Sequence, residues 1–359
     1  MCHTKYMRKI LIFLACSAAF SQAPGTLDPS KEPQAVIREN VNVVIAPTTV
    51  RDRSGSLVDG LQLQDFQLYD NNKLQRITAD VRDEQLSLVV AVQRSSNLTE
   101  SLPKIQRIGP LLSALVAGEG SEVAVVSFDH RIEVVQDFTN EATKINQAMQ
   151  KLTPGSSNHA VVDAVSTSVR MLQRRPRDHR KVLLLISEKR DRGSELHLRD
   201  ALEQAQFANI VIYSLDISTI VAALTDKGMP PPPPPIPVTA QHMPAGAAVT
   251  PTTVDQNYYL GNYIPVFVDI FKAVKSVFVD DTLDVFTRYT GGKEYSFISD
   301  RSLERAVTEI GEELHSQYLL SYSPNNQNEG GFHEIKVVVN RSGLEIRTRP
   351  GYWVAARPN

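Results

Sequence analysis

Three short stretches of the chain are almost wholly apolar, and helical patterns separate them. Residues 86–92, 182–186 and 210–215 lack the alternation of a half-exposed strand. Unbroken apolar runs of this length are typical of strands that are buried on both faces of a parallel sheet. Between the runs, apolar residues recur every three or four positions, as they do in amphipathic helices. The pattern therefore predicts an α/β domain with a doubly wound, mostly parallel sheet over residues 86–315.

Segments on both sides of this domain have β patterns instead. Residues 41–85 contain short strands separated by turn sequences, among them one strand over 74–79, and residues 316–359 end the chain in the same way. Each group has too few strands to bury a stable face alone. We expect the two groups to pair into one small β-sandwich, with Tyr318 and Tyr322 in its core.

The first 23 residues have the features of a secretory signal peptide. Three cations precede an apolar run over 10–20, which is too short to span a bilayer. Cleavage would release a secreted or periplasmic chain that begins with a linker over 24–40 and has no transmembrane segment. Both cysteines, Cys2 and Cys16, lie in this region, so the mature chain would have no disulfide. An uncleaved anchor and lipidation at Cys16 are the alternatives.

A proline-rich segment interrupts the α/β pattern at residues 229–253. It includes six consecutive prolines, from Pro230 to Pro235, which favour the polyproline II conformation. We interpret the segment as a solvated surface insertion. The alternative is a docking segment for a partner that binds proline-rich peptides.

The charge balance narrows the function. The chain has 38 Lys and Arg against 40 Asp and Glu, which gives a formal net charge of −2. Nucleic-acid binding needs a basic excess, so we expect no nucleic-acid partner. The sequence has no Gly-x-Ser-x-Gly, His-Glu-x-x-His or phosphate-loop motif, which argues against an enzyme. Histidines outside the candidate site, among them His333, are expected on loops or at the surface.

Several motifs occur in an order that resembles a known family. They are the segment 50–61, the Thr-Gly-Gly of 290–292, the segment 317–324 and the Arg-Pro-Gly-Tyr of 349–352. With them, the chain resembles the bacterial VWFA-related family, described mostly from acidobacteria, whose core is a von Willebrand factor type A domain. The resemblance implies a divalent-cation site at the carboxyl ends of the strands, where open α/β sheets place their ligands.

The family pattern for that site is Asp-x-Ser-x-Ser after the first strand, a Thr in a second loop and an Asp after a later strand. This chain departs from it at most positions. Gln93 stands at the first Asp, Ser95 matches, and Asn97 replaces the last Ser. His159 stands at the Thr, and Glu188 stands at the later Asp.

One carboxylate therefore remains where the usual site has two. Mg²⁺ needs about six oxygen ligands and sheds its water reluctantly, so a single carboxylate should hold it poorly. We expect a degenerate site without metal or cofactor. The alternatives are a true divalent-cation site, or a softer transition ion bound by His159 and Glu188.

These inferences predict a secreted or periplasmic, non-enzymatic, adhesion-like module that binds an unknown protein with little or no dependence on cations. The expected partner-binding face consists of Arg94, Ser95, Asn97, Ser157, His159, Glu188 and Lys189. Without a metal, Arg94 and Lys189 could meet an acidic partner directly. The alternative is a structural envelope scaffold that uses the β-sandwich or the proline-rich segment.

Overall fold

The computed structural model describes six stretches of the chain. They are residues 43–80, 85–99, 102–218, 281–297, 299–326 and 329–354. The expected signal peptide (1–23), linker (24–40) and proline-rich insertion (229–253) lie outside the described residues. Within these six stretches, no helix is both long and apolar enough to cross a membrane.

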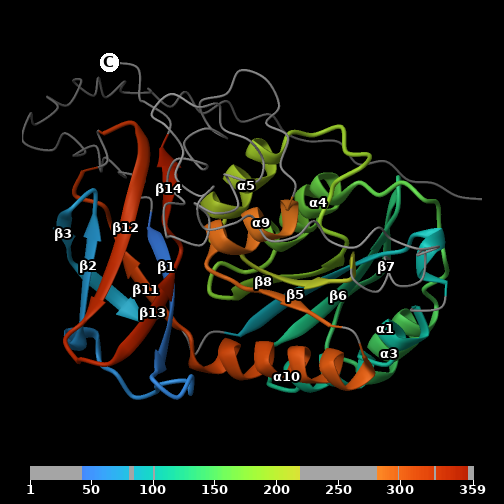
Figure 1. Cartoon of the computed structure of the whole chain (residues 1–359), viewed down its shortest axis with the longest axis horizontal. Helices are drawn as coiled ribbons and strands as arrows, with labels where there is room; N and C mark the ends of the chain where they lie inside the picture. Colours follow the sequence, from blue (N-terminus) through green and yellow to red (C-terminus); the bar gives the residue numbers. More distant parts are fainter. Residues whose placement is uncertain are drawn as a thin grey trace, which may run out of the picture. The chain divides into compact units, whose positions relative to one another are not determined.

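A six-stranded sheet forms the centre of the α/β domain, with the strand order β10-β9-β8-β5-β6-β7 (Figure 1). Its strands are β5 (Leu86–Gln93), β6 (Glu122–Phe128), β7 (Ile132–Thr139), β8 (Arg180–Ser187), β9 (Val211–Asp216) and β10 (Glu294–Ser296). All neighbouring pairs are parallel except β6 and β7, which are antiparallel. The predicted doubly wound, mostly parallel α/β sheet is therefore confirmed.

Helices cover both faces of this sheet (Figure 1). One face carries α1 (Leu102–Gln106), α2 (Gly109–Leu115), α3 (Ala142–Gln150) and α10 (Asp300–Ser316), and the other carries α4 (Val161–Gln173), α5 (Leu198–Phe207) and α9 (Thr282–Thr290). Along β5, Leu88 and Val90 belong to the first core, and Val89 and Ala91 belong to the second. Because both faces are buried, the strand has an unbroken apolar run.

The helical pattern after β5 is broken at Pro110. The apolar spacing predicts one kinked helix over 102–115, but α1 ends at Gln106 and α2 begins at Gly109. Pro110 lies in the first turn of α2, where its missing N–H costs no helical hydrogen bond. The proline thus starts a second helix instead of bending a single one.

The strands at the two ends of the described chain pair with each other, as predicted, into a small β-sandwich. One sheet has the order β13-β1-β11-β4, and the other has β14-β12-β2-β3. The strands are β1 (Val44–Asp52), β2 (Phe66–Asp70), β3 (Lys73–Gln75), β4 (Ile77–Asp80), β11 (Tyr318–Tyr322), β12 (Gly331–Val339), β13 (Leu344–Thr348) and β14 (Gly351–Val354). Tyr318 and Tyr322 are fully buried between the sheets, which confirms their predicted place in the core.

The single strand expected over 74–79 is instead two strands in different sheets. β3 pairs with β2 through a tight hairpin, whereas β4 pairs with β11. Asn71 and Asn72 occupy the hairpin with φ values of 47° and 61°, a left-handed conformation that asparagine tolerates better than most residues. Alternation alone does not reveal that the chain changes sheets at Arg76.

A buried carboxylate connects the β-sandwich to the α/β domain. Glu313 of α10 is fully buried and accepts hydrogen bonds from Arg347 of β13 and, at 3.4 Å, from Arg51 of β1. The Tyr213 hydroxyl of β9 donates at 2.9 Å to Glu313 Oε1, the oxygen that Arg347 also binds. A buried charge is tolerated only when it is paired and hydrogen-bonded, and these contacts satisfy that requirement.

The sequence predicts His333 on a loop or at the surface, but this residue is fully buried in the β-sandwich. Its Nδ1 lies 2.7 Å from Asp70 Oδ1, and its Nε2 lies 2.5 Å from the Glu329 carbonyl oxygen. Both ring nitrogens face acceptors, an arrangement that favours the doubly protonated imidazolium. The Tyr322 and Tyr352 hydroxyls donate to Asp70 Oδ2. The sequence pattern missed this site because its members lie far apart along the chain.

Candidate functional site

Three loops meet at the carboxyl ends of the parallel strands. Val92 of β5 is in register with Ser127 of β6 and Ile186 of β8, so these strands end at one edge of the sheet. The loop after β5 and the loop before α4 are joined here by a backbone hydrogen bond, which the Gly155 N–H donates to the Arg94 carbonyl at 3.0 Å. A Cβ on Gly155 would lie 2.6 Å from that carbonyl oxygen, so only glycine permits this approach.

The Gln93 side chain bridges β5 and β8 at this edge. It is fully buried, and its Oε1 accepts hydrogen bonds from the Ser187 hydroxyl and from the Glu188 N–H, both at 2.8 Å. Its Nε2 donates to Glu188 Oε1 at 2.8 Å. A glutamine amide thus supplies the donor that faces the remaining carboxylate, a contact that an aspartate at this position has no hydrogen to make.

His159 lies beside this carboxylate and is fully buried. Its Nε2 donates to the Arg190 carbonyl oxygen at 2.8 Å, which places the proton on Nε2 and leaves a lone pair on Nδ1 in the neutral ring. Nδ1 lies 4.0 Å from Glu188 Oε1 and has no hydrogen-bond partner in the described part of the chain. The structure therefore brings together Gln93, His159 and Glu188, as the family pattern implies.

The other predicted site residues vary in their surroundings. Ser95 is fully buried, and its hydroxyl has no hydrogen-bond partner among the described residues. Ser157 is exposed on the loop before α4. The side chain of Asn97 lies outside the described part of the structure.

Arg94 and Lys189 have their charges neutralised within the chain. Arg94 pairs with Glu133 at 3.2 Å. Lys189 Nζ lies 2.6 Å from Asp281 Oδ2, 2.8 Å from Glu294 Oε1 and 4.0 Å from Asp216 Oδ2. Carboxylates of this chain would therefore compete with an acidic partner for these two cations.

The Lys189 cluster perturbs the titration of its members. Burial alone would lower the pKa of Lys189, but the carboxylates of Asp281 and Glu294 outweigh it and raise that pKa. Burial, together with the negative charge of Asp281, raises the pKa of Glu294 to about 7. Three carboxylates around one ammonium leave this part of the edge with an excess of negative charge.

Three aspartates that no motif singled out as ligands hold the loops in place. Asp129 accepts hydrogen bonds from the Ser156 and Arg131 N–H groups, and these bonds lower its pKa although burial opposes the shift. Asp191 accepts from the Val161 N–H at 2.7 Å. Asp163 of α4 accepts from the N–H groups of residues 195 and 196. The site loops are therefore held by fixed hydrogen bonds.

Comparison with known proteins agrees with this architecture. Residues 70–190 match the family model of the von Willebrand factor type A domain. This chain contains a von Willebrand factor type A domain. Such domains commonly mediate protein interactions. No curated protein matches the chain.

Solved structures with a similar arrangement are distant in sequence. The conserved hypothetical protein BatB from Bacteroides thetaiotaomicron is 14% identical with a TM-score of 0.40, and the match covers 64% of this chain and 98% of that one. Proximal thread matrix protein 1 from the mussel byssus is 11% identical with a TM-score of 0.42, covering 66% and 49%. The vWF domain of the type V pili tip protein Mfa5 from Porphyromonas gingivalis is 20% identical with a TM-score of 0.26, covering 32% and 40%.

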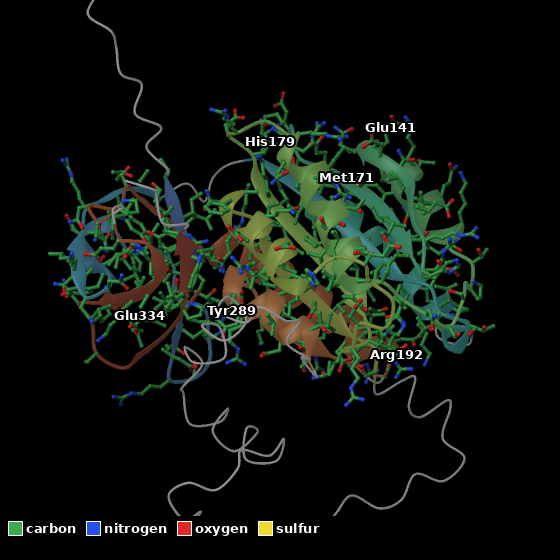
Figure 2. The ribbon with its side chains drawn as sticks, turned by 90° about the horizontal axis from the view of Figure 1, so that it is seen from above. Glu141, Met171, His179, Arg192, Tyr289 and Glu334 are labelled. Carbon is green, nitrogen blue, oxygen red and sulfur yellow. The ribbon has the colours of Figure 1, made fainter. Side chains whose placement is uncertain are left out.

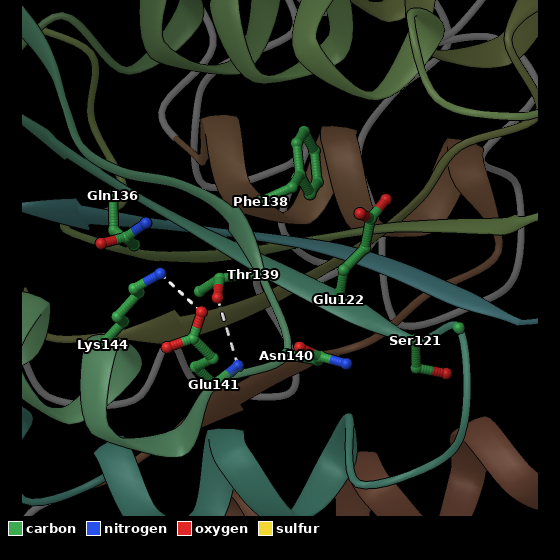
Figure 3. A pocket seen from close by; sticks show the side chains of 9 residues that line it. Ser121, Glu122, Gln136, Phe138, Thr139, Asn140, Glu141 and Lys144 are labelled. Carbon is green, nitrogen blue, oxygen red and sulfur yellow. Dashed lines mark hydrogen bonds and ion pairs between the residues drawn. The ribbon is translucent and has the colours of Figure 1, made fainter.

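A hollow lies at the opposite end of the von Willebrand factor A sheet (Figure 3). Its volume is about 450 Å³, and it is lined by Gly120, Ser121, Glu122, Gln136, Phe138, Thr139, Asn140, Glu141 and Lys144. Lys144 pairs with Glu141 at 2.5 Å, and Arg175 binds both oxygens of Glu122 at 2.6 Å. In Figure 2, Glu141 and Arg192, which follows β8, lie on opposite sides of the domain. Because the charged side chains of the hollow pair within the chain, the loops at the carboxyl ends of the parallel strands remain the candidate functional site.

Proposed function

We propose that this chain is a secreted or periplasmic, non-enzymatic module that binds a partner protein on the loop after β5, the loop before α4 and the loop after β8, without a divalent cation. The observation that carries the proposal is the hydrogen bond from Gln93 Nε2 to Glu188 Oε1. The amide places a donor on the one carboxylate at the family's ligand positions, so the carboxylate is stabilised without a metal. Location outside the cytoplasm rests on the apolar N-terminal run of the sequence.

The Gln93 side chain offers a direct test of the proposed independence from divalent cations. We expect Gln93→Asp to restore a second carboxylate and to make the domain bind Mg²⁺, because two anionic ligands supply most of the affinity of such a site. With free Mg²⁺ about 100-fold above the dissociation constant, binding should stabilise the variant by about 2.7 kcal/mol. Thermal denaturation with MgCl₂ and with EDTA measures the difference.

Gln93→Asn is the matched control, because asparagine has the size of aspartate but no charge. In EDTA it should be less destabilised than Gln93→Asp, which places two carboxylates side by side, and it should gain nothing from Mg²⁺. Equal responses of the two variants to Mg²⁺ would show that the charge at position 93 does not govern cation binding.

The binding face itself is tested by two substitutions at opposite ends of the sheet. Asn158 is exposed on the loop before α4, and Asn140 is exposed beside the hollow at the other end. We expect Asn158→Arg to reduce capture of a protein partner from an extract of the producing cells, in EDTA and in Mg²⁺ alike, whereas Asn140→Arg should leave it unchanged. Capture that needs Mg²⁺, or that only Asn140→Arg reduces, would contradict the proposal.

A further inference from the structure

At the carboxyl ends of the parallel strands, two buried side-chain acceptors lack a hydrogen-bond donor in the described part of the chain. Ser95 Oγ and His159 Nδ1 are fully buried and have no hydrogen-bond partner among the described residues. His159 Nδ1 lies 4.0 Å from Glu188 Oε1, and the Glu188 side chain retains 11% exposure, which gives the site contact with solvent. A buried acceptor without a donor costs about 1–3 kcal/mol, so the arrangement points to a missing donor.

We propose that this site binds the ammonium group of a lysine side chain of the partner protein. The inference rests on the proposed function and deepens it by naming the chemistry of the partner. An ammonium has three N–H donors and no acceptor, and the site offers an imidazole lone pair, a hydroxyl oxygen and a carboxylate. The chemical kind of these groups matches the donors of an ammonium.

The spacing of the two acceptors is wider than that of adjacent ligands on a metal ion. His159 Nδ1 and Glu188 Oε1 are 4.0 Å apart. Adjacent ligands of octahedral Mg²⁺, each at about 2.1 Å, are about 3.0 Å apart. Those of tetrahedral Zn²⁺, at about 2.0 Å, are about 3.3 Å apart. Two acceptors at about 2.8 Å from one ammonium nitrogen and 4.0 Å from each other subtend about 90° at it, which is compatible with two of its N–H directions.

The size and charge of the surroundings point the same way. Ser95 and His159 are fully enclosed, so a compact ammonium fits the site better than a planar guanidinium, which needs room for a wide fork of donors. The cations closest in sequence are neutralised, since Arg94 pairs with Glu133 and Lys189 lies among three carboxylates. The partner's charge would thus meet Glu188 without a competing free cation from these two residues.

Methylammonium, which carries the lysine head group alone, is the probe for this site. The full chain is titrated with methylammonium chloride and, at the same ionic strength, with tetramethylammonium chloride, which has the charge but no N–H donor. The ¹⁵N resonance of His159 Nδ1, assigned through its loss in His159→Gln, reports whether the lone pair accepts a hydrogen bond. We expect a saturable shift with methylammonium and none with tetramethylammonium.

Glu188→Gln should weaken the methylammonium response roughly tenfold, because it removes a charge-assisted hydrogen bond. If that variant does not fold, Ser95→Ala replaces it, since it removes one acceptor and leaves a small buried side chain. Equal responses to the two probes, or an affinity that neither substitution changes, would overturn the inference while leaving cation-independent partner binding intact. A shift of the Nδ1 resonance by micromolar Mg²⁺ would overturn the proposed function as well.

Discussion

Replacing Glu313 with alanine is expected to lower the free energy of unfolding by about 3–5 kcal/mol, the usual cost of breaking a buried ion pair. The substitution would leave Arg51 and Arg347 facing each other at the contact between the β-sandwich and the α/β domain, and it would remove the acceptor of the Tyr213 hydroxyl. Unfolding in urea, followed by circular dichroism, measures the loss.

Glu312→Ala is the control for this experiment, because Glu312 is exposed on the same helix. Its substitution should change the free energy of unfolding by no more than about 0.5 kcal/mol. A loss below about 1 kcal/mol in Glu313→Ala would show that the buried carboxylate does not hold the two parts together.

The second large effect is expected at Asp70, the counter-ion of the buried His333. Asp70→Asn should cost about 3 kcal/mol near pH 6, because the imidazolium would lose its charged partner. Asp59→Asn, on an exposed loop before β2, is the matched control and should have little effect. Urea unfolding at a series of pH values measures both variants.

The stability that this pair contributes is lost both at high pH and at low pH. Burial alone would lower the pKa of His333, but its hydrogen bonds to Asp70 and to the Glu329 carbonyl outweigh burial and raise that pKa above 6.5. Its contribution is therefore complete below pH 6.5 and is lost as the pH rises through the folded-state value. Burial alone would raise the pKa of Asp70, but hydrogen bonds from His333 and Asn326 outweigh it and lower that pKa below 3.8, so its contribution is lost as the pH falls through the folded-state value.

Asp70→Asn should weaken the pH dependence of the free energy of unfolding at both ends of the pH range. The wild-type chain should lose stability above pH 6.5 more steeply than the variant does, after correction for groups that titrate in both proteins. Parallel curves for the two proteins over this range would show that His333 does not depend on Asp70.

Much of the fold was predictable because burial dictates composition. A strand such as β5 is covered on both faces and needs an unbroken apolar run, which is visible in the sequence. Long-range polar contacts leave no such trace. Asp70 and His333 are 263 positions apart, and Glu313 and Arg51 are 262 apart, so no local pattern connects them.

The candidate site was predictable in part, through its order of residues. The family pattern placed Gln93, His159 and Glu188 at one edge, and the structure brings them together. It did not predict that Lys189 would be enclosed by carboxylates from distant segments, because Asp281 and Glu294 reach it only through the fold. The hydrogen-bonded role of the Gln93 amide likewise depends on the ends of β5 and β8 lying side by side.

The most direct test of the central claim is calorimetric titration of the wild-type chain with MgCl₂ and MnCl₂ after treatment with EDTA. We predict no binding tighter than the millimolar range, because the Gln93 amide already donates to Glu188 Oε1. Micromolar binding that EDTA reverses and that Glu188→Ala abolishes would contradict the account.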